Sequence, residues 1–125
     1  FATDENATDV GDLINPSQAL AGASSTTHGY AAGGHGTPAP GNRRDNIDKF
    51  AFASDGNSTD VGNLASAKDN TGGASSASYG FALGGAAGNK GNTIHRWAFA
   101  SDGNATDYAD MHESTQYAAV THDTA

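Results

Sequence analysis

The residues with the clearest capacity for chemistry form an Asp-x-Asn-x-Thr-Asp pattern that occurs three times. The copies run from Asp4 to Asp9, from Asp55 to Asp60 and from Asp102 to Asp107. Oxygen-bearing side chains at alternate positions resemble the start of a calcium loop, which supplies carboxylate, amide and carbonyl oxygens. The sixth position, however, is Asp where such a loop has glycine. Asp, Asn and Thr also form turns by bonding to their own backbone, so the pattern indicates either a turn or a calcium-stabilised repeat scaffold.

The same segments contain three Asn-x-Ser/Thr sequences, at Asn6, Asn57 and Asn104. In a secreted eukaryotic chain these would be glycosylation acceptors. Their recurrence at one position of a turn already has an explanation in turn chemistry, so both interpretations stay open.

Other side chains that could bind metals or react are scattered. The five histidines stand at positions 28, 35, 95, 112 and 122, and there is no cysteine. No two histidines have the spacing of a zinc site, and thiolate ligands are excluded. We expect His28 and His95 to be ordinary strand residues. The sequence therefore predicts no catalytic, cofactor-binding or metal-binding residues, no cofactor and no enzymatic activity.

The Asp-x-Asn-x-Thr-Asp pattern belongs to longer blocks that repeat along the whole chain. The block Phe1 to Leu13 returns at Phe52 and again at Phe99, so the copies begin 51 and then 47 residues apart. Two further blocks recur at these offsets. Ser24–Gly34 returns 51 residues later as Ser75–Gly85, and Ile47–Phe52 returns 47 residues later as Ile94–Phe99. Periods of 40–50 residues built from strand-like units are typical of propeller blades.

Within each repeat the pattern predicts short strands. The large apolar residues of Ile47–Phe52 stand at positions 47, 50 and 52, next to charges at 48 and 49, and Trp97 and Phe99 repeat the spacing of two that a half-buried strand requires. Asp55-Gly56 then predicts a hairpin turn, and Val61–Leu64 the returning strand. The glycine pairs 33–34 and 84–85 are read as turn and packing residues, and the segments 16–21 and 113–119 as irregular turns. We expect four aromatic residues to be largely buried between repeats: Phe50, Phe52, Trp97 and Phe99.

A family resemblance follows from these features. An aromatic residue before a glycine pair, a variable loop, an Ile-x-x-aromatic strand, a turn and a Val-Gly-x-Leu return resemble the kelch type of β-propeller repeat. The Phe-Ala-Ser-Asp-Gly-Asn segment is similar to tandem repeats of tail-fibre-like proteins from bacteriophages and environmental bacteria. The resemblance implies an all-β fold of four-stranded blades. It divides the chain into a partial repeat 1–27, a repeat 28–78 and an incomplete repeat 79–125, about two and a half in all.

Composition limits the classes of partner. The formal charge is −8, no basic patch suits a phosphate backbone, and no apolar run reaches the roughly 20 residues of a membrane span. Both ends fall inside a repeat, so we expect other copies or a longer chain to complete the ring. The expected function is that of a structural subunit of a large homo-oligomeric extracellular or phage-related particle. The alternative is a carbohydrate- or receptor-binding module of a tail-fibre or adhesin type.

Overall fold

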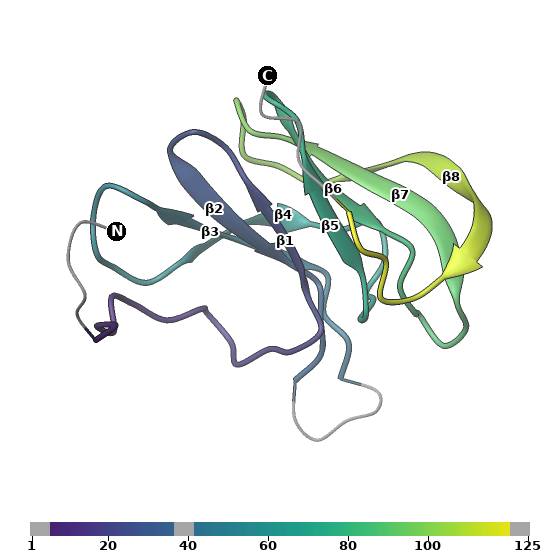
Figure 1. The fold of residues 1–125 in the computed structure, drawn as a ribbon, viewed down its shortest axis with the longest axis horizontal. Helices are drawn as coiled ribbons and strands as arrows, with labels where there is room; N and C mark the ends of the chain where they lie inside the picture. The colour runs from purple at the N-terminus through teal and green to yellow at the C-terminus, as the bar shows by residue number, and fades with distance from the viewer. Residues whose placement is uncertain (1–5, 37–41, 121–125) are drawn as a thin grey trace.

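The structure, a computed structural model, describes residues 6–36 and 42–120 and consists of two four-stranded antiparallel sheets (Figure 1). The first sheet contains β1 (Ala21–Ser24), β2 (His28–Ala32), β3 (Asn46–Ala51) and β4 (Thr59–Asn63) in chain order. The second contains β5 (Gly72–Ser75), β6 (Tyr79–Leu83), β7 (Gly91–Ala98) and β8 (Thr106–Thr115) in the same order. Residues 6–36 and 42–120 contain no helix. The prediction of an all-β fold is confirmed.

The two sheets repeat each other in register and in their turns. His28 pairs with Ala51 and Tyr79 with Ala98, which are equivalent positions of the two repeats. The tight turn before β2 is closed by Ser25, whose hydroxyl accepts the His28 N–H at 3.0 Å. Ser76 closes the turn before β6 in the same way, at 3.1 Å. Equal sequence at equal offsets therefore produces equal local structure.

The glycine pairs lie where the chain leaves β2 and β6. Gly33 and Gly34 have φ values of +70° and +89°, and Gly84 and Gly85 have +63° and +83°. A Cβ atom on Gly34 would lie 2.7 Å from a neighbouring backbone oxygen. Only glycine combines this conformation with so close an approach, which confirms that the pairs are turn and packing residues.

A column of hydrogen bonds links the three copies of the repeat. Ala19, Asn70 and Tyr117 occupy equivalent positions and are the described non-glycine residues with positive φ, between 56° and 58°. The Asn70 N–H donates to the Ala19 carbonyl at 2.8 Å, and the Tyr117 N–H donates to the Asn70 carbonyl at 2.9 Å. The same backbone hydrogen bond therefore joins the second copy to the first and the third copy to the second.

The segment that joins β3 to β4 differs from the expected hairpin. Seven residues, 52–58, separate the two strands, and an equivalent seven separate β7 from β8. Gly56 and Gly103 have φ values of +150° and +154°, outside the range of a two-residue turn. The loop is long because it docks on another repeat, as described below. The returning strand was expected at Val61–Leu64 and comprises Thr59–Asn63, whereas β8 extends to Thr115 into the segment read as an irregular turn.

The first copy of the block forms no strand in its described part, residues 6–13. Its residues 10–12 lie against the loop 52–58, where the N–H groups of Gly56 and Ser58 donate to the carbonyls of Val10 and Asp12. Phe1 lies outside the described residues, so its expected equivalence to Phe52 and Phe99 remains a prediction.

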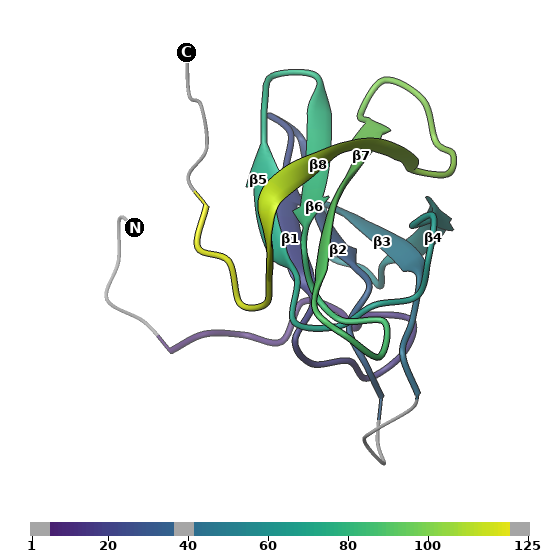
Figure 2. The same ribbon diagram turned by 90° about the vertical axis from the view of Figure 1, so that its right-hand side faces the viewer.

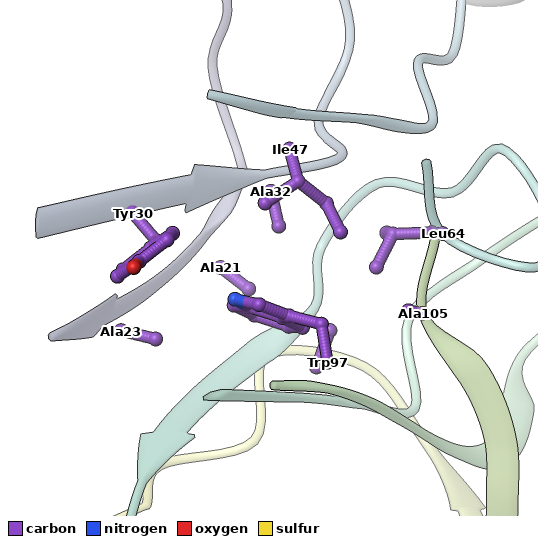
Figure 3. Close-up of a cluster of buried hydrophobic side chains, with 9 residues drawn as sticks. Ala21, Ala23, Tyr30, Ala32, Ile47, Leu64, Trp97 and Ala105 are labelled. Carbon is purple, nitrogen blue, oxygen red and sulfur yellow. The ribbon is translucent and has the colours of Figure 1, made fainter. Parts of the chain in front are cut away.

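The core lies between the two sheets (Figure 3), and its side chains come mainly from β1, β2, β3, β6 and β7. Strand β1 of the first sheet lies beside β5 of the second (Figure 1). The largest side chain of the core is Trp97, which is 3% exposed and faces Tyr30 across the sheets, with 6.3 Å between ring centroids. Small residues surround this pair and let the sheets approach closely. They are Ala21, Ala23, Ala32, Ala82 and Ala105.

The expected burial of four aromatic residues is confirmed only in the second repeat. Trp97 is buried and Phe99 is partly buried against the core, whereas Phe50 is 38% and Phe52 55% exposed. The sequence positions are equivalent, but Trp97 is covered by the first sheet, and no described sheet covers Phe50. The prediction was therefore wrong for Phe50 and Phe52.

Candidate interaction surface

The described part of the chain offers no reactive centre built from the expected residue types. Within residues 6–36 and 42–120 no group of three His, Cys, Asp or Glu side chains is placed to hold a metal ion. His35 lies 3.2 Å from Asp69, which is also 3.2 Å from Arg43. This cluster fastens the loop after β2 to the chain before β5. In the same ranges no helix is long and apolar enough to cross a membrane.

The Asp-x-Asn-x-Thr-Asp segments instead hold neighbouring repeats together. The Asn57 side-chain oxygen accepts the N–H of Asp12 at 3.0 Å, and Asn104 accepts the N–H of Asn63 at 3.0 Å. Next to each asparagine, a backbone N–H donates back to the same partner, from Ser58 to Asp12 at 2.9 Å and from Ala105 to Asn63 at 2.8 Å. Each asparagine thus pairs with the block of the preceding repeat.

The contact is close enough to require glycine on one side. A Cβ atom on Gly11 would lie 2.3 Å from the Gly56 carbonyl oxygen, and one on Gly62 would lie 2.2 Å from that of Gly103. The last aspartate of the pattern fixes this glycine, because the Asp60 carboxylate accepts the Gly62 N–H at 3.1 Å. Asp60, Asn57 and Asn104 of the pattern are therefore used in turns and in docking, and the amide oxygens of Asn57 and Asn104 already accept backbone hydrogen bonds.

Two further pairs cross from the first sheet to the second. The Lys49 ammonium lies 2.8 Å from the Asp102 carboxylate, and this hydrogen bond raises the pKa of Lys49. Tyr30 stacks on Phe99 with ring centroids 4.8 Å apart, and burial raises the pKa of the Tyr30 phenol. Strand β3 and the face of β2 thus recognise the Phe-Ala-Ser-Asp segment that follows β7.

One buried position differs between the repeats. Asp48 is 2% exposed and accepts the N–H of Ile14 at 3.2 Å and the hydroxyl of Ser58 at 3.3 Å. The equivalent residue of β7 is His95, which is 1% exposed and has an Nδ1 atom without a partner among the described residues. Burial, followed by the nearby positive charge of Lys68, lowers the pKa of His95 to about 4. His95 was expected to be an ordinary strand residue, and that prediction did not anticipate its burial or its lowered pKa.

Each sheet has one face in the contact and one that no described sheet covers. On the first sheet the uncovered face carries Phe50, followed by Phe52 and Asp55 of the loop 52–58, next to a shallow hollow of about 230 Å³ between Phe50 and Val10. We call it the aromatic face, defined by Phe50, Phe52 and Asp55. It corresponds to the face of the second sheet that the first sheet covers.

The uncovered face of the second sheet carries an arginine, whereas the aromatic face carries an aspartate. Figure 2 views the molecule from the side of β7 and β8. The Arg96 guanidinium lies 4.6 Å from the ring centroid of Tyr79 and 4.0 Å from that of Tyr108. Phe81 contacts Tyr108 edge to face, with 6.4 Å between ring centroids. We call this the arginine face, defined by Phe81, Arg96 and Tyr108. It corresponds to the Tyr30 and Lys49 side of the first sheet.

Sequence reasoning missed these docking residues, although a signal was present. A glycine that recurs two residues after the last Asp of the pattern, and an asparagine that recurs in the next repeat, indicate a pairing between repeats. The third copy breaks this rule, because Ala109 stands at the position of Gly11 and Gly62.

No protein-family model and no curated protein matches this chain. The kelch and tail-fibre resemblances therefore rest on the residues quoted above.

Proposed function

We propose that the chain is a non-enzymatic structural protein whose sheets are four-stranded, kelch-like blades of a β-propeller arrangement. The second sheet docks on the first along a contact that buries Trp97 against Tyr30. The chain would be a subunit of a large homo-oligomeric particle, extracellular or phage-related, to which it would contribute acidic four-stranded sheets.

The observation that carries this proposal is the repeated use of one contact. The pairs Asp12 with Asn57 and Asn63 with Asn104 have equal geometry, although they join different copies. In both of these copies the asparagine of the Asp-x-Asn-x-Thr-Asp pattern holds neighbouring repeats together. That is the role of a residue in a structural scaffold. Acidic charge keeps such a scaffold soluble.

Light scattering on the purified chain, combined with oligosaccharide titration, tests the proposal. We expect a mass of several copies of the 12.5 kDa chain, and no saturable change in tyrosine or tryptophan fluorescence with neutral or acidic oligosaccharides. A monomeric chain that binds an oligosaccharide with a defined stoichiometry would contradict the scaffold and support the carbohydrate-binding module.

A further inference from the structure

We infer that the aromatic face of one copy binds the arginine face of a second copy, so that copies associate head to tail. The inference rests on the proposed scaffold function and names the surfaces and residues through which it would assemble. The contact between the two sheets of one chain shows which side chains pair across such an interface, namely Lys49 with Asp102 and Tyr30 with Phe99.

The aromatic face lacks the partners that its equivalent has. Asp102 pairs with Lys49, and Phe99 stacks on Tyr30. Their counterparts in the first repeat are Asp55 and Phe52, both of which are exposed. Because these side chains stand at equivalent positions, a partner for this face should supply one cation and one aromatic ring with the spacing of Lys49 and Tyr30.

The arginine face supplies that pair. Arg96 stands at the β7 position equivalent to Lys49, and Phe81 at the β6 position equivalent to Tyr30. Arginine suits the role well, since its guanidinium can bind a carboxylate while it rests on the two tyrosine rings. Charge and residue type thus agree, with Arg96 opposite Asp55 of the second copy and Phe81 opposite Phe52.

Two features oppose the association, the segment 10–12 of the same copy and Ala109 of the second copy. The place beside Gly56 is filled by residues 10–12 of the same copy, through hydrogen bonds from Gly56 to Val10 and from Ser58 to Asp12. Strand β8 of a second copy must displace this segment in order to dock as β4 does. Ala109 carries a Cβ atom where Gly62 must avoid one, so β8 fits less well than residues 10–12. This mismatch lowers the association constant and so disfavours uncontrolled growth.

A charge exchange tests the inference by sedimentation equilibrium. Arg96→Glu and Asp55→Lys each place like charges opposite one another, so each should lower the association constant about tenfold or more. The double variant Arg96→Glu with Asp55→Lys restores opposite charges and should recover association. Lys90→Glu and Asp45→Lys are matched controls with the same charge changes at exposed positions outside both faces, and they should associate as the wild type does.

A second variant tests the steric part independently. Ala109→Gly removes the obstructing methyl group and should raise the association constant about tenfold. Circular dichroism and thermal unfolding of dilute samples establish that every variant is folded.

The outcomes separate this inference from the proposed function. If large particles form and neither charge variant weakens them, the inference is overturned while the scaffold function stands. If the wild-type chain stays monomeric at all concentrations, both the inference and the homo-oligomeric function fail.

Discussion

Replacement of Trp97 by alanine should reduce the free energy of unfolding by about 3–5 kcal/mol. Trp97 is 3% exposed, and it lies between Tyr30 of the first sheet and Gly80 of its own sheet, where a Cβ atom would be 2.4 Å from the indole ring. Hydrogen bonds join the loop after β7 to the first sheet, so the two sheets can collapse only partly into the space left by the indole. The cost is therefore the lost burial plus a cavity.

Phe50→Ala is the matched control, because Phe50 occupies the equivalent position of the first repeat. It is 38% exposed, and water can fill the space it leaves. Full burial of a phenylalanine side chain contributes about 1.5–3 kcal/mol, so a partly exposed one should contribute about 1–2 kcal/mol. Trp97→Phe should give an intermediate loss and keeps the comparison possible if Trp97→Ala does not fold.

Urea unfolding followed by far-ultraviolet circular dichroism provides the assay. Trp97 is the single tryptophan, so its replacement removes the fluorescence signal. Dilute samples keep association from adding to the apparent stability. Equal losses for Trp97→Ala and Phe50→Ala, or a loss below about 0.5 kcal/mol for Trp97→Ala, would refute the burial of Trp97 between two sheets.

The remaining predictions concern backbone contacts, protonation and metal. Gly80→Ala should destabilise the chain by about 1–3 kcal/mol, and Gly29→Ala by less, since the ring over Gly29 is partly exposed and free to move; chemical unfolding distinguishes the two. His95 has a folded-state pKa of about 4, below its unfolded value near 6.5, so neutral His95 favours the fold above pH 6.5 and this stability is lost as pH falls toward 4. The loss should be about 2 kcal/mol between pH 7 and pH 5, and His95→Gln should flatten it; an unchanged slope in His95→Gln would count against this assignment. Calcium or a chelator should leave the melting temperature unchanged, because Asn57 and Asn104 already accept backbone hydrogen bonds; a calcium-dependent rise in that temperature would support the calcium-stabilised scaffold.

The repeated structure could be predicted from the sequence because its determinants are local. The glycine pairs and the serine turns each specify a backbone conformation. These features recur at fixed offsets, and the structure repeats at those offsets. The all-β class follows directly from them.

The exposure of Phe50 could not be predicted in this way, because burial depends on the neighbouring sheet and not on the residue. Phe50 and Trp97 are equivalent within their own sheets, but only Trp97 has a described sheet over it. The environment of His95 depends on the same kind of information, since its neighbour Lys68 is distant in sequence. The docking role of Asn57 required knowing that the loop 52–58 meets residues 10–12.

Isotope-filtered nuclear Overhauser spectroscopy on a mixture of labelled and unlabelled copies tests the central claim most directly. Within one copy, the rings of Tyr30 and Phe99 are 4.8 Å apart and should give strong cross-peaks. At concentrations where copies associate, filtered spectra should show the equivalent cross-peaks between Phe81 of one copy and Phe52 of another. Strong Tyr30–Phe99 cross-peaks with none between Phe81 and Phe52 in an associated sample would contradict the claim that one contact builds both the chain and its assembly.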